Sequence, residues 1–224
     1  MSLLTPLFSA LMAAPRPSDV VLRRRHIDLF QADTWQGLAR RFEGADRYYH
    51  TWDHALDVLH RVDVVQQCLG WQDYDAAVYA ALYHDIVYRP TAGRGTNESD
   101  SLAALPDEFS ARAAYMILAT AHHGYGNRTE LSWDVGLFLD CDMAGFAAPD
   151  DVFDAQNIDL DDEARAHTSP EAYRAKRVPW LQQVQRNAAL IARPRRGGDH
   201  GEGIQRAPAG GHGPGDIAAC GQRE

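Results

Sequence analysis

Two apolar stretches with helical spacing carry histidine and aspartate side chains. The first, residues 49–58, reads YHTWDHALDV, and the second ends in the adjacent pair His84-Asp85. His50 and His54 are four residues apart, so both imidazoles would project from one face of a helix. The segment 76–88 around His84 is apolar nearly all round, which predicts a buried helix. An unpartnered carboxylate is costly in such a helix, and this favours metal binding by the pair over a solvated surface position.

These residue types are the ligands of a divalent-metal site. Imidazole nitrogens and a monodentate carboxylate suit Mn²⁺, Fe²⁺, Zn²⁺, Co²⁺ or Ni²⁺ better than Ca²⁺, and Mg²⁺ could occupy a second position. The alternative for His54 is a core histidine with its hydrogen bonds satisfied inside the protein. The sequence does not decide which metal binds, nor whether one ion or two are held.

The remaining sequence also follows helical periodicity, which predicts an all-α fold. No convincing period-2 stretch and no internal repeat is present. At 224 residues the chain has room for one domain with a sizeable core, predicted over residues 1–192. From residue 193 onward a Gly/Pro/Arg-rich tail to residue 224 is predicted to be disordered. Helices are expected over residues 18–30, 35–42, 50–69, 76–88, 97–105, 109–122, 133–143 and 170–192, the last one kinked or broken near Pro179.

Net charge restricts the classes of partner, and cysteine content indicates the cellular location. The net charge of −9 argues against a nucleic-acid polymer or an anionic membrane as the main partner. A small phosphate ester remains compatible, because a metal ion can supply local positive charge. The three cysteines show no metal-type spacing and indicate no disulfide framework, so a cytoplasmic location is expected. No segment approaches the roughly 20 apolar residues needed to span a bilayer.

The order of these clusters, a His, then His84-Asp85, then a downstream Asp, resembles the HD superfamily of metal-dependent phosphohydrolases. Residues 49–58 are similar to the signature of class I cyclic-nucleotide phosphodiesterases, as are the segments 117–120 (ILAT) and 141–143 (CDM). The whole chain most resembles a small bacterial family of predicted HD phosphohydrolases. The resemblance covers about residues 42–146 and implies an HD-domain-like helical bundle, whereas the segment after Asp150 matches poorly.

Transferred residue by residue, the resemblance implies a ligand set and a general acid. His50 would protonate the leaving alkoxide, since it lies one turn from a ligand. Asp85 could bridge two ions and help to deprotonate a water molecule, whose pKa a bound metal lowers towards about 7. The implied metal ligands are His54, His84, Asp85 and Asp142.

Several positions stay open at the level of sequence. Asp140 and Asp142 compete for one ligand role, and the Cys-Asp-Met context favours Asp142. His122 and His123 end a predicted helix, and one of them could reach the site as a second-metal ligand, a phosphate contact or a substitute acid. The pair Asn97-Glu98 matches an Asn-Glu pair of the family and is expected to support the ligands indirectly.

The sequence thus predicts a cytoplasmic, metal-dependent phosphohydrolase that acts on a small phosphate ester, such as a nucleotide or a related compound. Two other classes remain. One is a module that binds a nucleotide or second messenger without turnover. The other is a di-iron HD oxygenase, for which His122 and His123 would supply the additional ligands. Neither the substrate nor the oligomeric state can be deduced from these motifs.

Overall fold

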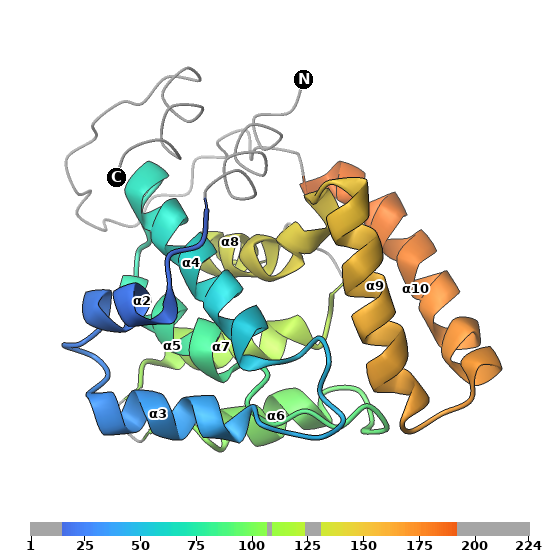
Figure 1. The fold of residues 1–224 in the computed structure, drawn as a ribbon. Helices are drawn as coiled ribbons and strands as arrows, with labels where there is room; N and C mark the ends of the chain where they lie inside the picture. The colour runs from blue at the N-terminus through green and yellow to red at the C-terminus, as the bar shows by residue number, and fades with distance from the viewer. Residues whose placement is uncertain (1–14, 107–108, 124–130, 192–224) are drawn as a thin grey trace.

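The computed structural model describes residues 15–106, 109–123 and 131–191, without the side chains of residues 32–33 and 185–191. This part of the chain is helical and contains no strand, which confirms the all-α prediction (Figure 1). The predicted tail over residues 193–224 lies outside it. None of the described helices is long and apolar enough to cross a membrane. The elements are α2 (Asp19–Arg25), α3 (Ala32–Arg41), α4 (Trp52–Cys68), α5 (Tyr74–Tyr83), α6 (Thr96–Leu102), α7 (Ala111–Thr120), α8 (Trp133–Asp142), the 3-10 helix η2 (Met143–Ala147), α9 (Asp150–Arg165) and α10 (Pro170–Ile191).

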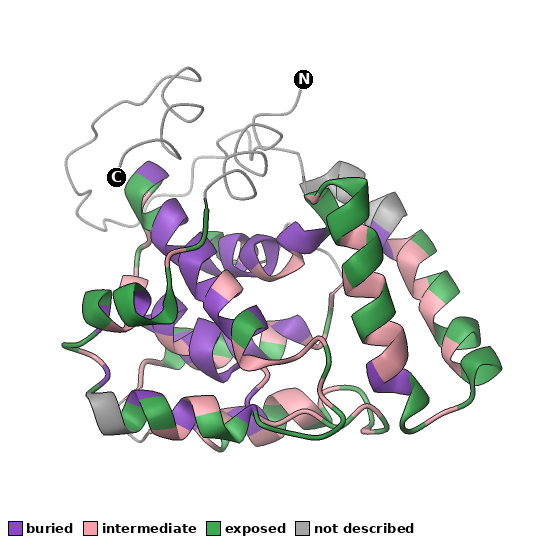
Figure 2. Cartoon of the chain, in the orientation of Figure 1, coloured by how far each residue is buried: buried purple, intermediate pink, exposed green. Residues whose placement is uncertain are grey.

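Helix α4 is the central element, and α2, α5 and α8 pack against it. Most of its residues are buried and are coloured purple on the ribbon in Figure 2. The helix ends at Gly70, whose φ of +76° is a left-handed conformation that glycine adopts without steric cost. The amides of Leu69 and Gly70 both donate to the Val65 carbonyl and so satisfy an end that would otherwise lack partners.

Helix α5 is shorter than the predicted helix over residues 76–88. Asp73 caps its start by accepting a hydrogen bond from the Ala76 amide at 3.0 Å. The helix ends at Tyr83 because the chain beyond it finds partners on α6. The Val87 amide donates to Ser101 Oγ, and the Ser101 hydroxyl donates to the Val87 carbonyl. His84 and Asp85 therefore lie at the carboxyl end of a buried helix, where their side chains can leave its surface.

Two buried carboxylates connect the helices around α4. Asp134, at the start of α8, accepts hydrogen bonds from the amides of Gln72 and Asp73 in the turn that precedes α5. Asp63 on α4 accepts a hydrogen bond from Tyr74 Oη at 2.6 Å and lies 3.1 Å from His26 Nε2. These contacts fix α2, α5 and α8 against α4, because a buried charge left without partners would be strongly destabilising.

Helices α9 and α10 form an antiparallel hairpin beside the bundle (Figure 1). The sequence reading did not predict α9, whose surface is mostly exposed (Figure 2) and in which only Glu163 and Ala164 are buried. The expected kink or break at Pro179 does not end α10, which is a single helix of 22 residues. Pro179 and Ala175, whose carbonyl loses its hydrogen-bond donor, are both exposed, so water can replace the missing amide.

The position of α4 predicts a large cost for shortening a side chain on its buried face. Leu59 is 0% exposed in the core cluster. Leu59→Ala should lower the free energy of unfolding by about 2–5 kcal/mol, because it removes buried methyl groups and leaves a cavity. Leu118→Ala on α7, where the leucine is 37% exposed, is the matched control and should cost about 1 kcal/mol or less. Urea unfolding of the two variants tests this, and equal losses would contradict the burial of α4.

Candidate metal centre

Side chains from three helices converge beside the first turn of α4. Donor atoms of His54, His84 and Asp85 all lie within 4.8 Å of one another, so this group could hold a metal ion. The two Nε2 atoms of the histidines are 3.3 Å apart. Asp85 Oδ2 lies 3.0 Å from His84 Nε2 and 3.6 Å from His54 Nε2. Asp142 approaches from the end of α8, with Oδ1 at 3.2 Å from His54 Nε2 and 3.5 Å from His84 Nε2.

These separations fit a shared transition-metal ion. Bonds of about 2.0–2.1 Å place neighbouring ligand atoms about 3.3 Å apart in a tetrahedron and about 3.0 Å apart in an octahedron. The three distances among the donor atoms of His54, His84 and Asp85 run from 3.0 to 3.6 Å, and Asp142 Oδ1 lies 3.2 and 3.5 Å from the two histidine Nε2 atoms. Two imidazoles and two carboxylates also supply the mixed nitrogen and oxygen ligands that Mn²⁺, Fe²⁺, Co²⁺ and Zn²⁺ accept. Donor chemistry and spacing therefore both suit a divalent ion, and neither selects one metal.

The backbone fixes the direction of the His84 ring. His84 Nδ1 lies 3.1 Å from the Ala81 carbonyl one turn earlier, so Nδ1–H donates to this oxygen. In the neutral ring the remaining lone pair is then on Nε2, which faces His54 and the two carboxylates. The ring of Tyr49 packs against His54 with centroids 4.9 Å apart, and Phe138 contacts His84 edge-on. Both imidazoles are therefore held with Nε2 directed at the same point.

The ionisable groups of this cluster strongly shift one another's pKa values. Burial disfavours the cationic form of His84, yet the carboxylates of Asp85 and Asp142 raise the His84 pKa well above 6.5. Burial likewise disfavours ionised Asp142, but His84 and hydrogen bonds from His123, His54 and His84 hold the pKa of this carboxyl well below 3.8. Without a metal, protons on the imidazoles neutralise the carboxylates. A divalent cation supplies the same positive charge.

His50 lies beside the cluster with a partner that the sequence reading missed. Its Nδ1 is 2.5 Å from Glu163 Oε2, and the Glu163 side chain is 1% exposed. The His50 ring stacks on Tyr88 with centroids 3.8 Å apart. Burial opposes the charged imidazolium, but Asp85 and Glu163 raise the His50 pKa above 6.5. A cationic His50 is therefore favoured next to the candidate metal ligands.

The prediction that His50 and His54 lie on one helix is wrong for His50. Helix α4 begins at Trp52 after the N-cap Thr51, so His50 lies in the preceding turn and not on the helix. The His50 and His54 rings are still neighbours, with centroids 5.9 Å apart. Arg47 holds this turn by donating to the carbonyls of His50, Asp85 and Ile86, which connects it to the chain after α5.

The structure shows which histidine and which aspartate of the two open pairs lies at the cluster. Of the two histidines after α7, His123 reaches the cluster with Nε2 at 2.6 Å from Asp142 Oδ2, whereas His122 is exposed. Of the two aspartates on α8, Asp142 contacts the histidines, whereas Asp140 is buried elsewhere on the helix.

Asn97, of the predicted Asn-Glu pair, contacts the backbone of Arg89, which follows Tyr88. Asn97 Oδ1 accepts from the Arg89 amide, and Asn97 Nδ2 donates to the Arg89 carbonyl, each at 3.0 Å. This two-point contact fixes the chain just after Tyr88, the residue on which His50 stacks. Glu98 is half-buried in the first turn of α6. Asn97 therefore contacts the chain next to Tyr88, and the supporting role expected of the pair stays a prediction.

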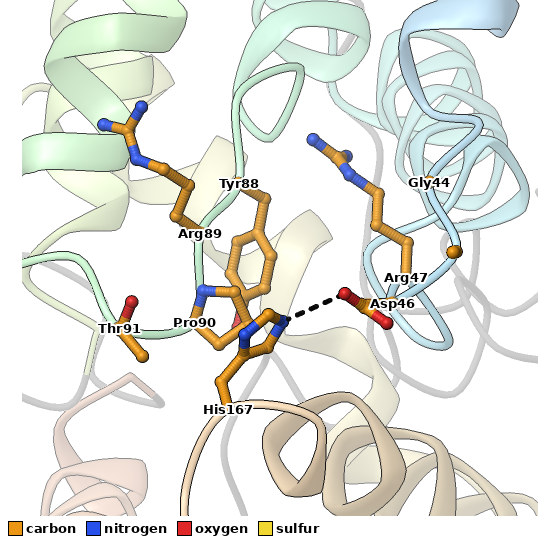
Figure 3. A pocket seen from close by; sticks show the side chains of 9 residues that line it. Gly44, Asp46, Arg47, Tyr88, Arg89, Pro90, Thr91 and His167 are labelled. Carbon is orange, nitrogen blue, oxygen red and sulfur yellow. Dashed lines mark ion pairs between the residues drawn. The ribbon is translucent and has the colours of Figure 1, made fainter.

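A pocket of about 340 Å³ lies between the turn before α4, the chain after α5 and the turn between α9 and α10 (Figure 3). Arg47 and Tyr88 line it and are also the residues that hold His50. Asp46 and His167 face each other across it at 3.5 Å, which connects the turn before α4 to the turn between α9 and α10. Tyr88 thus contacts both the pocket and the ring of His50.

Glu163 had a weak signal in the sequence. Phe153, Leu160 and Ala164 recur at helical spacing, and Glu163 lies on the same side, next to Ala164. An acidic residue on the apolar face of an otherwise acidic helix indicates a buried partner. The partner itself, 113 residues away, could not be found by spacing.

No protein-family model, curated protein or solved structure matches this chain. The coordinates themselves support a helical protein with a His54, His84 and Asp85 group that could hold a metal ion. The resemblance to the HD superfamily rests on the sequence motifs alone.

The convergent geometry predicts that metal content depends on the cluster. His84→Ala and Asp85→Ala should each remove most of the bound transition metal, because a ligand set of four loses one member. His122→Ala is the matched control, since this histidine is exposed, and should leave the metal content unchanged. Elemental analysis of the purified proteins after loading with Mn²⁺, Fe²⁺ or Zn²⁺ measures this. Full metal content in Asp85→Ala would show that the ion binds elsewhere.

The pKa shifts predict how pH affects the stability of the metal-free protein. His84 has a raised pKa, so its stabilising contribution is complete below about pH 6.5 and is lost as pH rises through its folded-state pKa. Asp142 has a depressed pKa, so its contribution is present above about pH 4 and is lost as pH falls through its folded-state value. Urea unfolding should therefore show the wild type losing more stability than His84→Asn between about pH 5 and about pH 9. Parallel losses would contradict the ion pairing of His84.

Proposed function

We propose that this protein is a metal-dependent phosphohydrolase of the HD type, which cleaves a small phosphate ester such as a nucleotide or a related compound. One observation carries the proposal: a cluster with the spacing of metal ligands lies beside His50, whose ring is held by a buried carboxylate. Hydrolysis of a phosphate ester needs both an activated water and an acid for the leaving oxygen. The motif order His, His-Asp, Asp supports the same reaction class.

The candidate ligands would be His54, His84, Asp85 and Asp142. A divalent ion held there supplies a Lewis acid that orients the phosphoryl group and lowers the pKa of a water towards about 7. The Asp85 carboxylate is placed to accept the proton of the attacking water, because it is part of the ligand group and is only half-buried. Asp142 would be held in position as a ligand by His123, whose Nε2 lies 2.6 Å from Asp142 Oδ2.

His50 is the proposed general acid, and Glu163 positions it. The Nδ1–H of cationic His50 donates to Glu163 Oε2, which leaves Nε2–H to protonate the leaving alkoxide. The stacked Tyr88 ring prevents rotation of the imidazole out of this orientation. Glu163 also stabilises the charged ring before proton transfer. Loss of Glu163 should therefore weaken acid catalysis without removing a metal ligand.

Two other functions are distinguished by measurement. A binding module without turnover would hold a nucleotide tightly and form no product with any metal. A di-iron oxygenase would contain two irons per chain and form an oxygen-dependent product. The oxygenase was expected to use both His122 and His123, and the exposure of His122 does not favour it. A small phosphate ester as partner, rather than a nucleic-acid polymer or a membrane, remains part of the proposal.

The proposal predicts distinct effects in the ligand and acid positions. With metal-loaded protein and a panel of aryl and alkyl phosphate esters, Asp85→Ala should abolish turnover. His50→Ala and Glu163→Gln should both retain the metal. On esters with poor leaving groups, kcat should fall about 10²–10⁴-fold in His50→Ala and about tenfold or more in Glu163→Gln. Both losses should shrink on activated aryl esters, whose leaving groups need no proton.

The control for this experiment is Glu171→Gln, which changes an exposed glutamate at the start of α10 and should keep full activity. Losses in His50→Ala that are equal for good and poor leaving groups would remove His50 from the role of acid. Absence of turnover on every ester, with tight nucleotide binding, would replace the hydrolase by the binding module.

A further inference from the structure

Helix α10 brings an arginine to the edge of the candidate centre. Trp180 Nε1 donates to the His123 carbonyl at 3.0 Å, and His123 in turn contacts Asp142. Arg177 lies three residues before Trp180, so both side chains project from the same face of α10. Its guanidinium carbon lies 4.5 Å from the centre of the Trp180 ring. The helix face that contacts the site therefore carries a positive charge.

The charge of Arg177 acts on two tyrosines that contact the site histidines. Burial raises the pKa of Tyr49 and of Tyr88, and the positive charge of Arg177 opposes both rises. Tyr49 packs on His54, and Tyr88 stacks on His50. The charge of Arg177 therefore acts on the two tyrosine rings that contact His54 and His50.

Most hydrogen-bonding capacity of Arg177 is unused. A guanidinium has five N–H donors. One hydrogen bond is present in the described part of the chain, from Nη2 to Asn157 Oδ1 at 3.2 Å. The Nε atom is buried without a hydrogen-bond partner among the described residues. Burying such a donor is costly, and burial accordingly lowers the pKa of Arg177.

The other arginines near the centre are already engaged. Arg47 donates to three backbone carbonyls, and Arg61 donates to the Cys141 carbonyl. Among the described residues, the one hydrogen bond of Arg177 goes to a neutral amide oxygen, and its guanidinium lies over the rings of Trp180 and Phe146, so it can bind an anion. The planar guanidinium can bind two oxygens of a phosphoryl group at once.

We propose that Arg177 binds a phosphoryl oxygen of the substrate from the α10 side of the site. This inference rests on the proposed function and assigns to the α9–α10 hairpin a role in substrate binding. The hairpin then supplies two functions to one site: Glu163 positions the acid, and Arg177 holds the anion. The ligand class is a phosphate monoester or diester, or inorganic phosphate as the product.

Binding of inorganic phosphate to the metal-loaded protein tests this role without requiring turnover. Isothermal titration should show Arg177→Gln weakening phosphate binding about tenfold or more, as expected for loss of charged hydrogen bonds. Arg177→Lys should recover part of the affinity, because lysine keeps the charge but not the two-point geometry. Arg174→Gln changes an exposed arginine one turn earlier on α10 and should bind phosphate like the wild type.

A purely structural Arg177 gives a different result. In that case Arg177→Gln lowers the melting temperature while phosphate affinity stays at the wild-type value, and this would overturn the proposal. If Arg177→Gln does not fold, the wild-type protein still decides, because phosphate must shift the Arg177 Nε–H resonance, identified with Arg177→Lys. An unmoved resonance would also overturn it. Arg177-dependent phosphate binding without hydrolysis of any ester would retain this inference and refute the hydrolase.

Discussion

The close approach of two imidazoles and two carboxylates at the start of α4 is the interaction on which the rest of the site depends. Donor atoms of His54, His84 and Asp85 lie 3.0–3.6 Å apart in a largely buried position, and Asp142 Oδ1 lies 3.2 Å from His54 Nε2. Such a concentration of polar groups is stable only when a cation, bound protons or a metal ion, balances the carboxylates. The helices that deliver these groups must therefore be held rigidly, and Asp63 and Asp134 fix them with buried polar contacts.

The α9–α10 hairpin is the second feature that decides what the site could do. It contributes little to the core, since most of its surface is exposed. Its inward contacts nevertheless reach both sides of the cluster: Glu163 binds His50, and Trp180 binds the carbonyl of His123. A peripheral hairpin with few but polar contacts can supply acid positioning and anion binding while the bundle supplies the ligands. The weakly packed part of the fold is thus the part that would set specificity.

Helical periodicity predicted helices correctly where one face or the whole circumference of the helix is buried. The helices around Leu59, Ala80 and Phe138 were predicted because apolar residues recur at helical spacing there. The prediction failed for α9, whose acidic surface hides a narrow apolar stripe. At Pro179 the helix is not broken, because solvent exposure makes the lost hydrogen bond tolerable. The prediction also placed His50 within a helix, although the chain turns before Thr51 and positions this ring through Arg47.

The sequence by itself determined that the protein is helical and that His54, His84 and Asp85 are candidate ligands, because spacing and local polarity are properties of short segments. Only the tertiary structure distinguished Asp142 from Asp140 and His123 from His122. Only it joined Glu163 to His50 across 113 positions and brought Arg177, through its neighbour Trp180, towards His123. These choices depend on how helices pack, and helix packing depends on contacts between residues that are far apart in the chain.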